Sequence, residues 1–70
     1  MYKYIEVKPD VCGGKPVIKG TRVTVEIILE SLANGWSVKE TAEEFKIPVE
    51  AVLEALKYAH NIVSKVSVYV

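Results

Sequence analysis

Ten residues near the N-terminus constrain the fold of this chain more than any other segment. Residues 13–22 combine three glycines, three cations and one proline. Glycine adopts positive φ and permits close backbone approach, so this density of glycine predicts one tightly specified turn. The β-forming residues 17–18 and 21–23 flank Lys19-Gly20, which predicts a short β-hairpin with a two-residue turn. This basic hairpin is the first place where we expect a binding surface.

The length of 70 residues allows one domain, residues 1–70, with a small core. A core of this size supplies only about 3–5 kcal/mol of net stability without a further staple. Disulfides are excluded because Cys12 is the single cysteine, and the sequence has no pattern of metal ligands around Cys12 or His60. Half of the residues are hydrophobic, which indicates apolar surface left over for a partner. We therefore expect a homodimer without a metal or cofactor.

Charge is unevenly distributed along the chain, although the formal net charge is zero. Residues 1–25 carry five cations and two carboxylates, a balance of +3, whereas residues 37–60 carry three cations and five carboxylates, a balance of −2. No stretch approaches the roughly 20 apolar residues of a membrane span. The N-terminus also lacks the apolar region of a signal peptide, so we expect a cytoplasmic protein.

Apolar periodicity predicts helices in the middle of the chain. Thr24 is expected to cap the first, whose apolar stripe begins at Val25, and Asn34-Gly35 is expected to end it with a left-handed cap. Ser37 and Glu40 match the capping-box pattern, in which the two side chains satisfy each other's backbone donors. A second helix is therefore predicted to begin after Ser37.

Residues 38–60 have the spacing of a helix-turn-helix. A third helix is predicted from residue 48 to about residue 62, because proline suits the first turn of a helix. Ala42, Ile47 and Val52 lie where this motif needs a small residue, an apolar turn residue and a second helical core residue. A plain three-helix core is the alternative that this spacing leaves open.

The polar face of the third helix is mostly acidic. It is formed by Glu50, Glu54, Lys57 and Asn61. An acidic surface repels the phosphates of DNA. We therefore do not expect this helix to read bases in the major groove.

The third helix also carries two apolar stripes side by side. The first consists of Val49, Val52, Leu53, Leu56 and Val63. The second consists of Ala51, Ala55, Tyr58 and Ile62. One stripe is expected to face the core, and we assign the second to a partner interface, because a chain of this size should not leave it in water. The alternative is that a terminal strand covers it within one chain.

The two ends of the chain are predicted to be strands. Residues 2–7 are rich in β-formers and precede a turn. Residues 63–70 alternate Val66 and Val68 with polar or aromatic residues, which is typical of a strand. These strands are expected to pair within one chain or between two chains, and a swapped sheet would place Val66 and Val68 in the interface.

Nothing in the sequence favours an enzyme. Cys12 has no base nearby that would activate its thiol, and a lone His60 on the edge of an apolar stripe is typical of a packed residue. Residues 14–21 do not match a phosphate-binding loop, which needs glycine, lysine and a hydroxyl residue in succession. We expect a non-enzymatic protein.

Several elements together resemble one known family. They are Gly13-Gly14-Lys15-Pro16-Val17-Ile18, Gly20-Thr21-Arg22-Val23, Val25, Asn34-Gly35-Trp36-Ser37 and residues 52–58. Over about residues 4–60, the chain resembles the small prokaryotic family called domain of unknown function 433. The resemblance implies a mostly α fold with short β elements. Its three-helix homeodomain-like or winged helix-turn-helix core would span residues 25–62, after a strand and basic hairpin in residues 1–24 and before a strand in residues 63–70.

The resemblance also implies roles for individual residues. Those that would set the hairpin geometry are Gly13, Gly14, Gly20 and Thr21. Arg22 would present its planar fork to a phosphate or a carboxylate, with Lys15 and Lys19 as further DNA- or partner-binding residues. The alternative for Arg22 is an internal salt bridge with Glu26, four residues later.

Function follows from the same resemblance. It implies the antitoxin of a type II toxin-antitoxin pair, which neutralises a PIN-like ribonuclease and binds DNA as a dimer. The alternative is a homodimeric protein-interaction module that does not bind DNA and retains the helix-turn-helix only as a relic. The valine-rich end after His60 departs from the more polar tail expected of the family.

Overall fold

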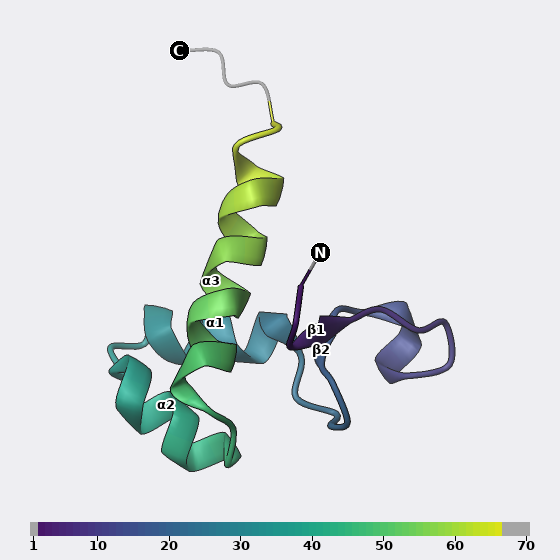
Figure 1. Cartoon of the computed structure of the whole chain (residues 1–70). Coiled ribbons are helices and arrows are strands. Elements are labelled where there is room, and N and C mark those ends of the chain that lie inside the picture. The colour runs from purple at the N-terminus through teal and green to yellow at the C-terminus, as the bar shows by residue number, and fades with distance from the viewer. Residues whose placement is uncertain (1, 67–70) are drawn as a thin grey trace.

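Short strands in the N-terminal third precede three helices. The computed structural model describes residues 2–66. Its elements are β1 (Ile5–Glu6), a turn of 3-10 helix (Cys12–Gly14), β2 (Val17–Ile18), α1 (Val25–Ala33), α2 (Val38–Phe45) and α3 (Val49–Val63). The two-stranded sheet and α2 lie on opposite sides of α1, and α3 projects beyond them at its C-terminal end (Figure 1). The expectation of a mostly helical fold with short β elements is confirmed.

Helix α1 has the ends that its sequence predicts. The Thr24 hydroxyl accepts a hydrogen bond from the Ile27 N–H at 3.1 Å. At the other end Gly35 has φ +96°, and the Trp36 N–H donates to the Ser31 carbonyl at 3.1 Å. This is the Schellman arrangement, in which a residue of positive φ lets the chain turn back and satisfy the last carbonyls.

Helices α2 and α3 are joined by a turn of three residues, 46–48. The capping box at the start of α2 is present, since the Ser37 N–H donates to Glu40 at 2.8 Å and the Glu40 N–H donates to Ser37 Oγ at 3.0 Å. Lys46 ends α2 in the left-handed conformation, with φ +57°. Pro48 lies one residue before α3, at the N-cap, where its missing N–H leaves no donor unsatisfied.

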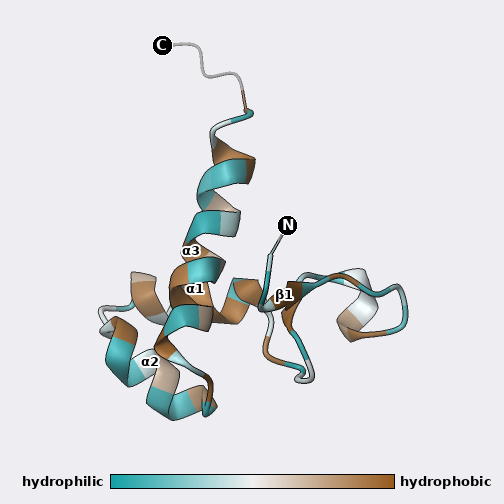
Figure 2. Cartoon of the chain, in the orientation of Figure 1, coloured by the Kyte–Doolittle hydropathy of each residue, from teal (hydrophilic) through white to brown (hydrophobic). Residues whose placement is uncertain are grey.

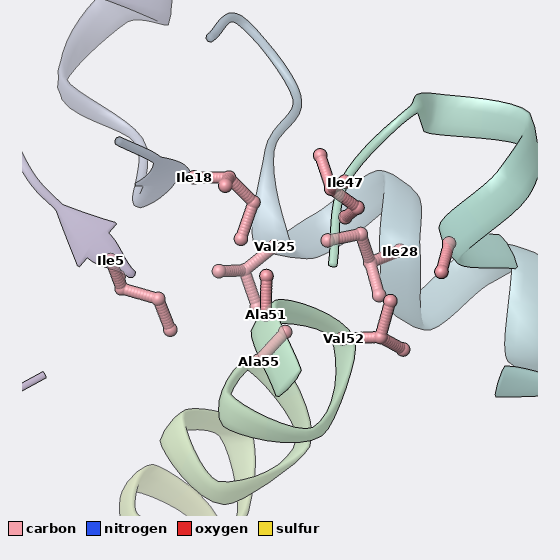
Figure 3. Close-up of a cluster of buried hydrophobic side chains, with 9 residues drawn as sticks. Ile5, Ile18, Val25, Ile28, Ile47, Ala51, Val52 and Ala55 are labelled. Carbon is pink, nitrogen blue, oxygen red and sulfur yellow. The ribbon is translucent and has the colours of Figure 1, made fainter. Parts of the chain in front are cut away.

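The core gathers residues from both strands, from the three α-helices and from the turn before α3. It consists of Ile5, Ile18, Val25, Ile28, Ala42, Ile47, Ala51, Val52 and Ala55. Figure 3 shows the side chains of α1 and α3 directed toward those of the two strands and of the turn before α3. The α3 side of this cluster is mainly alanine, so the backbone of α3 can approach its neighbours closely.

Strand β1 pairs with β2 and not with the end of the chain. The pairing is antiparallel, with Ile5 opposite Ile18 and Glu6 opposite Val17. The strand predicted from residue 63 is wrong for residues 63–66: Val63 belongs to α3, and the Ser64 N–H continues the helical pattern by donating to the His60 carbonyl at 2.8 Å. Continuing a helix adds one hydrogen bond per residue, whereas a strand here lacks a free β1 edge of useful length. Residues 67–70, and with them Val68, lie outside the described residues.

The hairpin turn at Lys19-Gly20 is confirmed, but its second arm is not a full strand. Gly20 has φ +75°, and the Thr21 N–H donates to the Ile18 carbonyl at 3.0 Å. Thr21 closes the loop further, because its hydroxyl donates to the same carbonyl and accepts from the Val23 N–H. Beyond this loop, only an isolated bridge between Val17 and Thr24 continues the pairing.

Within residues 2–66, no helix has both the length and the apolar character needed to cross a membrane.

Candidate interaction surfaces

The three cations of the basic hairpin differ in their contacts with the described residues: Lys15 forms an ion pair, whereas Lys19 and Arg22 do not. Lys15 Nζ lies 2.9 Å from Glu26 Oε1, and both side chains are largely exposed. The Glu26 carboxylate raises the pKa of Lys15, first by the hydrogen bond and then by its charge, and Lys15 lowers the pKa of Glu26 in the same way. The salt bridge suggested between Arg22 and Glu26 is therefore wrong, since Glu26 pairs with Lys15. Lys19 and Arg22 are exposed and have no ion-pair partner among residues 2–66.

The glycines before β2 shape a left-handed turn. Cys12, Gly13 and Gly14 all have positive φ, at 50°, 67° and 85°. A Cβ on Gly13 would meet nothing within 4 Å, so the requirement at this position is conformational and not spatial. The Cys12 thiol lies 3.6 Å from the Arg22 carbonyl and thus connects this turn to the hairpin loop. Pattern alone identified the glycines but did not indicate that Cys12 shares their conformation.

The polar face of α3 holds the N-terminal segment. The Glu54 carboxylate accepts hydrogen bonds from the backbone N–H groups of Lys3 and Tyr4, the second at 2.8 Å. The Tyr2 ring packs edge-on against Tyr58 with centroids 5.1 Å apart, and the Asn61 amide donates to the Tyr2 hydroxyl. Glu54 and Asn61 are therefore structural groups. The contact of Tyr2 with Tyr58 agrees with the alternative that a terminal segment covers this residue within one chain. The hydrogen bonds to Glu54 and Asn61 were not predicted, because they join residues at least fifty positions apart.

An apolar groove of about 390 Å³ separates α1 from the second half of α3. It is lined by Lys15, Pro16, Val25, Glu26, Leu29, Tyr58, Ala59, Ile62 and Val63. We call it the α1–α3 groove. The Lys15–Glu26 ion pair belongs to its lining, while most of the remaining lining is aliphatic or aromatic. A groove of this chemistry fits an amphipathic segment of a protein better than a polar small molecule.

The stripe assigned to a partner is partly wrong. Ala51 and Ala55 have no exposed surface, so they are core residues and cannot contact a second protein. The physical reason is size, because the smallest residues of α3 lie where it approaches the rest of the fold most closely. Tyr58 is half-buried beside Tyr2, whereas Ile62 is 51% exposed. Val66 is 60% exposed in the turn after α3.

The first apolar stripe of α3, which begins at Val49, lies mostly at the surface. Its exposed members are Val49 at 39%, Leu53 at 43%, Leu56 at 37% and Val63 at 65%. Of that stripe, only Val52 is buried. Apolar positions recur along α3 up to its C-terminal end (Figure 2). Each stripe therefore contributes to both environments: Ala51, Ala55 and Val52 belong to the core, while Ile62 and the other members of the first stripe are exposed.

An acidic groove lies beside α2. It is lined by Trp36, Glu40, Glu43 and Glu44. Trp36 is 40% exposed, and the capping hydrogen bonds from Ser37 lower the pKa of Glu40. These carboxylates give α2 a surface that phosphates would avoid.

Comparison with known proteins identifies a family but no named relative. No curated protein and no solved structure matches the chain. A family model matches residues 5–59, which is more than half of the 70 residues and includes the hairpin and all three helices except the end of α3. The chain therefore belongs to the family described as Protein of unknown function (DUF433).

Proposed function

We propose that this chain is an antitoxin-like protein whose main activity is to bind another protein, a PIN-like ribonuclease. We also infer that α2, the turn at residues 46–48 and α3 form a helix-turn-helix. The burial of Ala42, Ile47 and Val52 supports this inference, because the motif needs these three positions in its core. The ribonuclease is the partner that the family resemblance implies.

The exposed face of α3 is the reason why we propose a protein, and not DNA, as the main binding partner. In a DNA-binding helix-turn-helix, the outer face of the second helix enters the major groove. On α3 this face presents the exposed Leu53 beside Glu50, and Glu54 on its edge binds the backbone of residues 3–4. Exposed apolar surface and carboxylates oppose phosphate binding and favour contact with a protein.

The α1–α3 groove is the surface that we assign to the ribonuclease. Its apolar lining would take the apolar side of an amphipathic segment, and the Lys15–Glu26 pair would meet polar groups of that segment. Ile62 is the most suitable probe, because it lines the groove and is 51% exposed, so its replacement does not disturb the core.

The test measures inhibition of RNA cleavage. A PIN-like ribonuclease encoded beside this gene should be inhibited by the purified chain, and Ile62→Glu should lose most of this inhibition. Ile27→Glu is the matched control, because Ile27 is 37% exposed on α1 but does not line the groove. Absence of inhibition by the unmodified chain, or equal inhibition by Ile62→Glu, would refute the proposal.

A second candidate activity, DNA binding, rests on the hairpin turn. Lys19 and Arg22 are exposed and unpaired among residues 2–66, while Lys15 is engaged by Glu26. If both free cations contact phosphate, the logarithm of the affinity should fall with the logarithm of salt concentration at a slope of about −1.8 per subunit. Arg22→Ala should halve this slope, whereas Lys39→Ala on α2 should leave it unchanged. If the chain does not bind DNA at low salt, the proposal of DNA binding is refuted.

A further inference from the structure

One side of α3 has the spacing of a coiled-coil seam. The seam consists of Val49, Leu53, Leu56, His60 and Val63, and we call it the α3 seam. Successive members are alternately four and three residues apart, which is the d-a-d-a-d series of a heptad repeat. Four of the five are apolar, and each of these four is exposed by at least 37%. A single chain has no need of this regularity on a surface facing water.

The α3 seam lies beside the surfaces that the chain already uses, and Leu53 with the flanking Glu50 and Lys57 lines a hollow next to residues 2–4. Ala51, Val52 and Ala55 face the core, and Glu54, Tyr58 and Asn61 contact the N-terminal segment. At 3.6 residues per turn, the seam occupies the remaining side of the helix. Only Val63, at its end, also lines the α1–α3 groove.

We propose that the α3 seam binds the same seam of a second copy, so that two α3 helices pack antiparallel about a two-fold axis. A two-fold interface is self-complementary, which a seam of one sequence must satisfy when it meets itself. The small core of a 70-residue chain gives a physical reason for the association, since burial of the seam adds apolar area that one chain leaves in water.

Charges beside the seam select the antiparallel direction. Glu50 and Lys57 flank the seam on one edge, and both are exposed without an ion-pair partner among residues 2–66. The other edge carries no charge within α3, since it consists of the buried Val52 and of Ala59. Parallel helices would bring the charged edge of one copy against the uncharged edge of the other. Antiparallel helices bring the two charged edges together.

The same charges select one register. With Leu53 opposite Leu56 of the second copy, Val49 lies opposite His60, and Glu50 lies within about two residues of Lys57 along the helix axis on both sides of the dyad. A shift by one heptad would place Leu56 opposite His60 of the second copy and bring the two Lys57 side chains together. The first register forms two ion pairs, whereas the second forms a repulsive contact. The first register pairs only residues 49–60 of the two copies. Val63, the last residue of the seam, therefore stays free together with the groove residue Ile62.

The test is the oligomeric state of the purified full chain, measured by sedimentation equilibrium up to millimolar concentration. The unmodified chain should form a dimer, and Leu53→Asp should raise the dimer dissociation constant by about a hundredfold or more, because each dimer loses two buried leucines. Ile27→Asp, which adds the same charge at an exposed isoleucine outside the seam, should leave the constant unchanged. A monomer at every concentration would overturn the proposal, as would a dimer unaffected by Leu53→Asp.

Charge variants test direction and register without placing a charge in the seam. Glu50→Lys and Lys57→Glu should each raise the dissociation constant by roughly tenfold, because each replaces two attractive contacts with two repulsive ones. The double variant should restore it. Glu50→Lys without effect, or a double variant that fails to recover, would overturn the antiparallel register. The outcome is independent of ribonuclease inhibition, since Glu50, Leu53 and Lys57 do not line the α1–α3 groove.

Discussion

Two sides of α3 carry apolar residues of different size, and their surroundings differ accordingly. Ala51 and Ala55 on one side are fully buried, whereas Leu53 and Leu56 on the other are exposed by 43% and 37%. Hydrophobicity alone would favour burial of the leucines. In a small fold the backbone of α3 must approach α1 and the strands closely, and alanine permits that approach. The difference teaches that side-chain volume selects the core side of this helix and leaves the larger residues at the surface.

The largest effect is expected when a larger residue is substituted on each side of α3 and the free energy of unfolding is compared. Ala55→Leu should lower the free energy of unfolding by about 1–3 kcal/mol, because Ala55 is fully buried and three further carbons would have to displace its neighbours. Val63→Leu, on the exposed side, should change it by less than about 0.5 kcal/mol. Urea denaturation at low protein concentration measures both. A stable Ala55→Leu would show that the alanine side is not closely packed, which would reopen it as an interface.

A second test concerns the edge between these two sides, where α3 holds the N-terminal segment. Glu54→Ala should lower the free energy of unfolding by about 1 kcal/mol, because two backbone donors lose a partly exposed carboxylate. It should also speed hydrogen exchange at the Tyr4 amide. Glu43→Ala on α2 is the control, since its carboxylate makes no such contact. Unchanged exchange at Tyr4 in the Glu54 variant would show that this edge of α3 is free.

The smallest expected effect is at the Lys15–Glu26 pair beside the α1–α3 groove. Because Lys15 lowers the pKa of Glu26, the pair stabilises the fold above the ordinary carboxyl pKa of 4.5, and this contribution is lost as pH falls through the lower value of the folded state. Lys15→Met should abolish this part of the acid dependence. Thermal melts between neutral and acidic pH measure it, with Lys19→Met as the control. Identical pH profiles for Lys15→Met and the unmodified chain would show that the pair does not contribute.

Helix ends were predictable because their signals are local. Thr24, Ser37, Glu40 and Gly35 act on backbone groups within five residues, and each has its expected role. The turn at Gly20 was predictable for the same reason. Such signals require no knowledge of the rest of the fold, so a single sequence suffices to find them.

Candidate site residues were less predictable, because their environment depends on distant segments. The Glu26 partner is Lys15 and not the nearer Arg22, since the loop before β2 places Lys15 beside α1. Glu54 and Asn61 had the pattern of a solvated face, yet the N-terminal segment crosses it. The end of the chain alternated like a strand, but Val63 is the last residue of α3 and residues 64–66 form a turn after it.

By itself, the sequence determined the order and ends of the helices, the glycine-dependent turns and the membership of a family. Only the tertiary structure decided which apolar stripe of α3 is core, which cation pairs with Glu26 and where the N-terminal segment lies. The physical reason is the range of the interactions. Caps and turns depend on backbone groups a few residues away, whereas packing depends on which side-chain volumes fit between elements distant in the chain.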